Sequence, residues 1–197
     1  MDQTIYLVRH AHANYQADER TRELSERGMK ERQLLDDYFE GISITAIVSS
    51  PYRRAVQTVE TVAEKKGLPI TYDERFRERL IRKGYIENFT EVVKQMWAEP
   101  SFSFPDGESN KVGTSRIVDG FFAHAQTGST LISTHGNILT LLLYSFDRAY
   151  NYRHWLNMPM PALYRLDKAE GAWTISPQML HHSQTVYPAK PCGNENR

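Results

Sequence analysis

An arginine and a histidine, Arg9 and His10, end a short apolar run at residues 5–8. Such a run is typical of a buried strand. In a parallel α/β sheet, the carboxyl ends of the strands border the crevice in which ligands bind. A guanidinium matches phosphate oxygens and stays charged, and an imidazole acts as base, acid or nucleophile near neutral pH. The pair therefore predicts phosphoryl chemistry, although a strand that simply ends in two polar residues gives the same pattern.

Two further expected strands also end in polar residues. Ser49 and Ser50 follow one of them, and His135 follows another, while Arg54 lies just beyond the serines. If these strands are parallel neighbours, Arg9, His10, Arg54 and His135 converge on one crevice. Phosphoryl transfer needs this placement, because the transferred group spreads negative charge over its equatorial oxygens and fixed cations neutralise it.

The elements that must position these residues alternate along the chain. Strands are expected at residues 4–8, 46–48, 70–72 and 131–134, and a hairpin at residues 162–166 and 172–175. Helices are expected at residues 25–40 and 52–66, from 109 to about 127, and from 137 onward. This alternation predicts an α/β fold, a three-layer sandwich in which helices flank a largely parallel central sheet.

One segment interrupts the alternation. Residues 80–105 carry Trp97, Phe102, Phe104 and two prolines, and they predict a helical insert or lid whose aromatic residues either line the lid or pack locally. Residues 1–187 are expected to form a single domain that contains this insert, and residues 188–197 a disordered tail.

The composition excludes several classes of function. The chain has 197 residues, 40% of them apolar, and equal numbers of acidic and basic residues, which argues against a nucleic-acid partner. The only cysteine, Cys192, allows neither an internal disulfide nor a Cys-rich metal site. The N-terminus lacks the pattern of a secretory signal, and the longest apolar run is too short to span a membrane. A cytoplasmic protein without a membrane partner is therefore expected.

Taken together, the motifs resemble those of the histidine phosphatase superfamily, which includes phosphoglycerate mutases. The resemblance covers residues 6–166, and the motifs occur in the order found in the family. They are Leu-Val-Arg-His-Ala at residues 7–11, Leu-Ser-x-x-Gly at 24–28, Ser-Ser-Pro-x-x-Arg-Ala-x-Gln-Thr at 49–58, Phe-Arg-Glu at 76–78 and Ser-Thr-His-Gly at 133–136. Several spaced motifs in one order are far more specific than the Arg-His pair alone.

The resemblance implies a role for each member of the site. His10 is the nucleophile, and it forms a phosphohistidine by in-line attack on phosphorus. Arg9, Arg54 and His135 hold the phosphoryl group, while Glu78 is the general acid for the leaving oxygen and later the base for water. No metal or other cofactor is implied. Because His10 must present a lone pair, its other ring nitrogen should bond to a fixed acceptor.

Further binding positions follow from the same resemblance. Gln16 stands where the family often has a phosphate-binding asparagine, and Asn14 is a nearby alternative. Gly136 completes the second His-Gly motif as a substrate-binding position. Ala11 replaces the usual glycine, which costs little if its φ is negative. Ser49 and Ser50 are expected to cap the following helix rather than to act as nucleophiles.

The assignment of the acid leaves alternatives open. The sequence that follows Glu78 is unlike that of many members of the family, so Asp73, Glu74 and Glu108 stay as alternative acids. Glu78 could also be a plain ion-pair partner of a neighbouring arginine.

Three functions fit the sequence. The first is a metal-independent phosphomonoesterase that acts on a small phosphorylated metabolite or a phosphoprotein. The second is a phosphoglycerate mutase, for which the chain is short. The third is a phosphate-binding regulatory protein that has lost turnover, which the alanine at position 11 and the uncertain acid motivate. The sequence leaves the substrate and the oligomeric state open.

Overall fold

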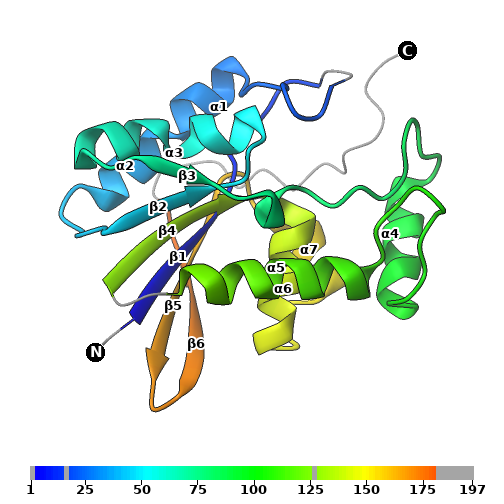
Figure 1. The fold of residues 1–197 in the computed structure, drawn as a ribbon. Coiled ribbons are helices and arrows are strands. Elements are labelled where there is room, and N and C mark those ends of the chain that lie inside the picture. Colours follow the sequence, from blue (N-terminus) through cyan, green and yellow to red (C-terminus); the bar gives the residue numbers. More distant parts are fainter. Residues whose placement is uncertain (1–2, 16–17, 126–127, 181–197) are drawn as a thin grey trace.

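A central sheet carries helices on both faces in the computed structural model, which describes residues 3–15, 18–125 and 128–180 (Figure 1). Within these residues the sheet has six strands. Their order is β3 (Ile70–Tyr72), β2 (Ala46–Ser49), β4 (Gly128–Thr134), β1 (Gln3–Arg9), β5 (Ala162–Ala169) and β6 (Ala172–Gln178). The strands β3, β2, β4 and β1 are parallel to one another, β5 runs antiparallel to β1, and β6 runs antiparallel to β5. The predicted α/β fold is thus confirmed.

The helices cover the two faces of the sheet, as Figure 1 shows. One face carries α1 (Glu26–Glu31), α2 (Gln33–Phe39) and α3 (Arg53–Lys66), and the other carries α5 (Asn110–His124), α6 (Gly136–Phe146) and α7 (Tyr152–Asn157). Alternate residues of β1 enter the two cores: Ile5 and Leu7 pack with α5 and α6, whereas Tyr6 and Val8 pack with α2 and α3. This period of two makes the buried strand apolar on both sides.

The helix expected at residues 25–40 is interrupted, so this prediction was wrong in detail. Arg32 ends α1 and precedes α2. The N–H of Leu35 donates to the carbonyl of Arg32 over 3.0 Å, which is a tightened three-residue turn within the ladder. The apolar spacing stays helical through such a turn, so sequence periodicity does not detect the break.

The insert at residues 80–105 is helical, with α4 (Phe89–Ala98) flanked by loops. It has its own apolar cluster of Ile81, Val93 and Met96, against which Phe102 and Phe104 pack. Trp97 meets Tyr144 of α6 edge-on, with 5.0 Å between the ring centroids. Phe102 and Phe104 therefore pack within the insert, whereas Trp97 also packs against the core beside α6.

Some expectations lie outside the described residues. They concern Gln16, Cys192 and the tail at residues 188–197. Among the helices that the structure describes, none combines the length and the apolar character that crossing a membrane requires.

Candidate active site

The ends of β1, β2 and β4 place the candidate residues at one edge of the sheet (Figure 1). Arg9 pairs with Thr134 in the β1–β4 ladder, and Ser49 pairs with Ser133 in the β2–β4 ladder. The ladders continue one residue further, since the N–H of His10 donates to the carbonyl of Thr134 over 3.0 Å. Parallel pairing thus brings chain segments far apart in sequence to the same edge.

His10 is held in one tautomer. Its buried ring lies with Nδ1 2.7 Å from the carbonyl oxygen of Ala11, which can only accept, so Nδ1 carries the proton. Nε2 therefore has the lone pair, and it accepts from Nε of Arg54 at 3.2 Å. Burial and then the Arg54 charge hold the pKa of His10 well below its usual value. His10 is thus a neutral imidazole with its Nε2 lone pair beside a cation. Ala11 is outside the positive-φ region, so its methyl group costs no backbone strain.

His135 lies beside His10, with 5.2 Å between the ring centroids. Its Nε2 is 2.8 Å from Oγ of Ser50, and that oxygen already accepts the N–H of Tyr52 at 3.3 Å. The Ser50 contact orients the ring through Nε2, so Nδ1 is the ring nitrogen left for a further partner. Among the described residues, this buried Nδ1 has no hydrogen-bond partner. Burial and the Arg54 charge also lower the pKa of His135, so a neutral ring presents an N–H donor.

The two arginines are buried and fixed. Arg54 lies in the first turn of α3 and is 1% exposed; burial lowers its pKa to about 10, so it stays charged at neutral pH. Arg9 donates through Nη1 to the carbonyl of Met158 and, at 3.3 Å, to that of Pro159. These carbonyls follow α7 and orient the guanidinium from the antiparallel side of the sheet.

Gly136 begins α6 against the Arg9 side chain. A Cβ atom at this position would lie 2.8 Å from Nε of Arg9 and 3.0 Å from its Cζ. The glycine therefore provides the space in which the guanidinium lies, and this contact favours a role in shaping the site.

Glu78 points to the start of the same helix. Its Oε2 accepts the N–H of Asn137 at 3.2 Å, and its Oε1 accepts the N–H groups of Ile138 at 3.1 Å and Arg79 at 2.9 Å. These backbone donors, rather than an arginine side chain, fix the half-buried carboxyl group next to the His135–Gly136 corner.

The alternative acids are engaged elsewhere. Burial favours a higher pKa for Asp73, but hydrogen bonds from Arg75 and His124 outweigh it and hold that pKa well below its usual range. Glu108 also has a lowered pKa, because hydrogen bonds from Arg116 outweigh its burial. Glu74 is exposed and pairs with Arg20 at 2.5 Å. Each of these three carboxylates thus pairs with an arginine, whereas Glu78 accepts from backbone N–H groups beside the His135–Gly136 corner. This difference favours Glu78 as the acid.

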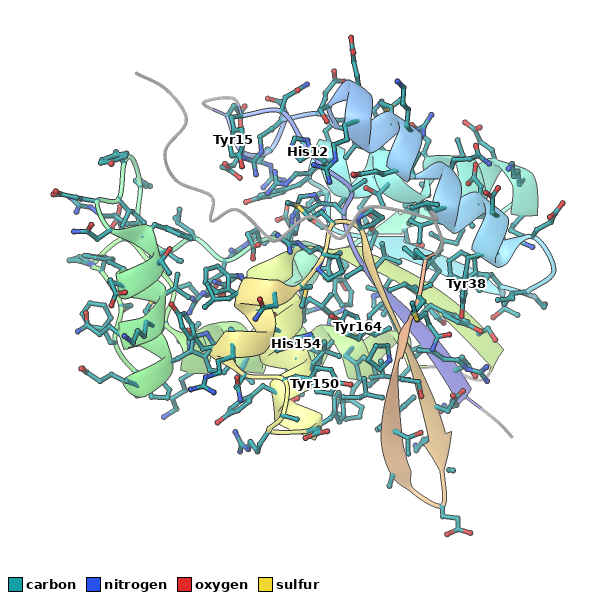
Figure 2. All side chains as sticks on the ribbon, turned by 180° about the vertical axis from the view of Figure 1, so that it is seen from behind. His12, Tyr15, Tyr38, Tyr150, His154 and Tyr164 are labelled. Carbon is teal, nitrogen blue, oxygen red and sulfur yellow. The ribbon has the colours of Figure 1, made fainter. Side chains whose placement is uncertain are left out.

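The loop between β1 and α1 holds the remaining predicted residues. Asn14 is exposed, and its amide donates to the carbonyl of Leu24 at 3.3 Å. The structure therefore gives Asn14 a contact within the loop, and Gln16 lies outside the described residues. His12, labelled in Figure 2, has its Nδ1 2.7 Å from Oγ of Ser25.

Three side chains of the site escaped the sequence reading. Ser49 and Ser50 were predicted to cap the following helix, and this prediction was wrong, because Tyr52 is the N-cap of α3 and the helix has no side-chain cap. The Ser50 hydroxyl contacts His135 instead. Glu19 accepts from Arg54 at 3.0 Å, and Arg22 pairs with Glu19 at 3.1 Å. The two charged residues occur in a polar loop, and no periodicity distinguishes them from solvated charges.

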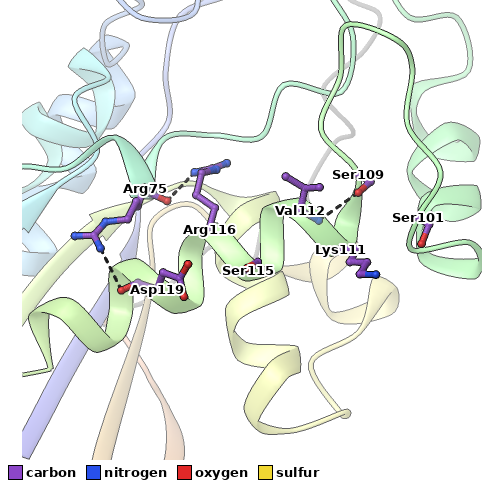
Figure 3. A pocket seen from close by; sticks show the side chains of 8 residues that line it. All are labelled: Arg75, Ser101, Ser109, Lys111, Val112, Ser115, Arg116 and Asp119. Carbon is purple, nitrogen blue, oxygen red and sulfur yellow. Dashed lines mark hydrogen bonds between the residues drawn. The ribbon is translucent and has the colours of Figure 1, made fainter.

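A groove of about 730 Å³ runs along α5, away from these residues (Figure 3). Its cations are largely engaged, since Arg75 pairs with Asp73 and Arg116 with Glu108. None of the candidate residues at the strand ends lines this groove. In the part of the chain that the structure describes, no three His, Cys, Asp or Glu side chains cluster as metal ligands.

Comparison with known proteins defines the class of this chain. The family model described as "Histidine phosphatase superfamily (branch 1)" matches residues 5–178, and the chain belongs to this superfamily. The "Probable phosphoglycerate mutase GpmB" of Salmonella choleraesuis is 26% identical over 191 residues, which are 87% of this chain and 88% of that protein. The protein of that name from Salmonella arizonae is 28% identical over 147 residues, 68% of this chain and 65% of that protein. The match to the Citrobacter koseri protein spans 59% of its length.

Solved structures share the fold. The mycobacterial glucosyl-3-phosphoglycerate phosphatase in complex with inorganic phosphate has a TM-score of 0.70 and 20% identity, with 88% of this chain and 95% of that chain covered. The phosphoglycerate mutase of Bacillus anthracis has a TM-score of 0.71 and 18% identity, with 90% and 92% covered. These neighbours include a phosphatase and a mutase, so the fold alone leaves both activities open.

Proposed function

We propose that this protein is a metal-independent phosphomonoesterase that works through a phosphohistidine. Its substrate class is a small phosphorylated metabolite or a phosphoprotein, and a cytoplasmic location is part of the proposal. The observation that carries it is the neutral His10 ring, whose Nδ1 is fixed on the Ala11 carbonyl while the Nε2 lone pair lies beside Arg54. Membership in the superfamily supports phosphoryl transfer as the reaction class.

The first chemical step follows from this arrangement. Nε2 of His10 attacks phosphorus in line, the N–P bond forms, and the P–O bond to the leaving group breaks. Arg9 and Arg54 neutralise the charge that spreads over the equatorial oxygens, and the neutral His135 ring donates a hydrogen bond to it from Nδ1. The carboxyl group of Glu78 gives its proton to the leaving oxygen.

The second step regenerates the protein. Glu78, now a carboxylate, takes a proton from a water molecule while the oxygen of that water attacks phosphorus. The N–P bond breaks, and inorganic phosphate leaves. Both steps use the same cations, because the phosphoryl group moves little between its two partners. Within this proposal, an incoming alcohol in place of water would give transfer rather than hydrolysis.

Hydrolysis of p-nitrophenyl phosphate in EDTA, from about pH 4 to about pH 8, tests the proposal directly. We expect turnover in the presence of the chelator and its loss in His10→Ala. Equal turnover in both proteins would mean that another group is the nucleophile. Turnover lost in EDTA and restored by a divalent cation would contradict metal independence.

A phosphoglycerate mutase is the second candidate, favoured by the names of the sequence relatives. It requires the phosphohistidine to survive until the intermediate reorients, so water must be kept from it. The measurement compares interconversion of 2- and 3-phosphoglycerate with hydrolysis of either compound. Faster interconversion would reverse the ranking, and phosphate binding without either reaction would indicate a regulatory phosphate-binding protein.

A further inference from the structure

A carboxylate of the chain itself bridges two arginines at the candidate site. Oε2 of Glu19 is 3.0 Å from Nη2 of Arg54, and Oε1 is 3.1 Å from Nη1 of Arg22. The Glu19 backbone carbonyl also accepts from Nη1 of Arg54 at 2.5 Å. Two guanidinium groups therefore converge on one pair of anionic oxygens, a geometry that also suits a phosphoryl group.

Arg22 is joined to Arg54 through Glu19, whose carboxylate contacts both guanidinium groups. Its charge contributes to the lowered pKa values of both His10 and His135. Its side chain is only 13% exposed, and its Nε is buried with no hydrogen-bond partner among the residues that the structure describes. The guanidinium carbon lies 5.8 Å from the centre of the Tyr15 ring, which Figure 2 shows on the loop after β1. Arg22 thus combines a fixed charge with unused donor capacity.

Glu19 differs from the arginines that it bridges, because its side chain is 54% exposed while that of Arg54 is 1% exposed. The carboxylate therefore reaches the buried guanidinium from the solvent side, as an incoming phosphate must. An exposed carboxylate loses little when its ion pair is broken, since water solvates it again. A phosphate dianion carries more charge and more acceptor oxygens, so it can displace this carboxylate.

We propose that Arg22 is a third arginine of the phosphoryl-binding pocket, and that Glu19 is an internal competitor which the phosphoryl group displaces. This inference rests on the proposed function only in locating the pocket at His10 and Arg54. It assigns opposite effects on phosphate affinity to two neighbouring residues: Arg22 strengthens phosphate binding, and Glu19 weakens it.

The test measures the affinity of the protein for inorganic phosphate in two ways. Calorimetry gives the dissociation constant directly, and competitive inhibition of p-nitrophenyl phosphate hydrolysis gives an inhibition constant. Arg22→Gln should weaken phosphate binding by about 10-fold or more, the loss expected for a charge-assisted hydrogen bond. Arg22→Lys keeps the positive charge but lacks the planar guanidinium, so its phosphate affinity should lie between those of the wild type and Arg22→Gln. Glu19→Gln should tighten binding by about 2- to 5-fold, the strength of an exposed ion pair.

A second ion pair of the same region supplies matched controls. Glu23 is 56% exposed and lies 3.6 Å from Arg53, which is 42% exposed. Glu23→Gln and Arg53→Gln remove the same charges from neighbouring positions, and both should leave phosphate affinity within about 2-fold of wild type because screened surface charges act weakly at a distance. Unfolding curves of all variants show that the affinities refer to folded protein.

The outcomes separate the two proposals. Weaker binding in Arg22→Gln together with tighter binding in Glu19→Gln supports the inference, and any other pair of signs overturns it. Turnover that depends on His10 with unchanged affinities in these variants contradicts the inference alone. Opposite shifts in affinity without any turnover contradict the phosphomonoesterase proposal alone.

Discussion

Ser50→Ala tests whether the orientation of His135 matters for the chemistry. The Ser50 hydroxyl accepts from Tyr52 and contacts Nε2 of His135 at 2.8 Å, so it holds the imidazole in its orientation. Removing a buried partner in this way costs about 1–3 kcal/mol of stability. Loss of a complete transition-state donor costs about 10²–10³ in kcat. Because the substitution removes the orientation and not the donor, we expect kcat to fall by roughly 10–100-fold.

Ser133→Ala is the matched control. Ser133 is also fully buried, and its hydroxyl donates to the carbonyl of Ala55 at 2.8 Å without contacting an imidazole. Both variants should lose a similar amount of stability in urea unfolding, while only Ser50→Ala should lose kcat for p-nitrophenyl phosphate with little change in KM. Equal losses of kcat in the two variants would refute the positioning role, as would wild-type kcat in a destabilised Ser50→Ala.

Three further predictions follow. Gly136→Ala should raise KM for p-nitrophenyl phosphate by about 10-fold, because the new Cβ would lie 2.8 Å from Nε of Arg9. Gly41→Ala is the control, since nothing lies within 4 Å of a Cβ at that position, and it should leave KM and kcat unchanged. Glu78→Gln should reduce hydrolysis of an alkyl phosphate by about 100-fold or more and that of p-nitrophenyl phosphate much less, since a good leaving group needs no acid; equal losses on both substrates would argue against the acid role. The folded-state pKa of His10 is lowered, so below pH 6.5 the unfolded chain binds a proton that the folded protein does not. The free energy of unfolding should therefore decrease as the pH falls below 6.5 toward the folded-state value, by up to about 1.4 kcal/mol per pH unit for this group. Urea unfolding between neutral and acid pH measures this slope, and a slope that His10→Gln does not reduce would contradict it.

The sequence allowed much of the fold to be predicted because its signals are local. Apolar runs that end in polar residues marked β1, β2 and β4, and the parallel order of these strands brought Arg9, His10 and His135 to one edge. The break at Arg32 was missed because a single tightened turn leaves the apolar spacing intact. Periodicity reports which face is buried, and it is insensitive to a one-residue change in the hydrogen-bond ladder.

The site was predictable where the residue types are distinctive and unpredictable where they are common. A serine just before an expected helix is most simply predicted as its cap, but α3 has no side-chain cap, and the contact of Ser50 with His135 depends on how the strands pair. Glu19 and Arg22 belong to a loop rich in charges, and their convergence on Arg54 depends on the path of that loop. Such contacts are set by tertiary structure and leave no pattern along the chain.

Trapping the phosphorylated protein tests the central claim most directly. Radiolabelled p-nitrophenyl phosphate is mixed with wild-type protein and with His10→Gln, and the reactions are quenched in base, in which a phosphohistidine survives. The account predicts label that stays with the wild-type protein, is released by acid, and is absent from the variant. Equal label in the variant, or acid-stable label on another residue, would contradict His10 as the nucleophile.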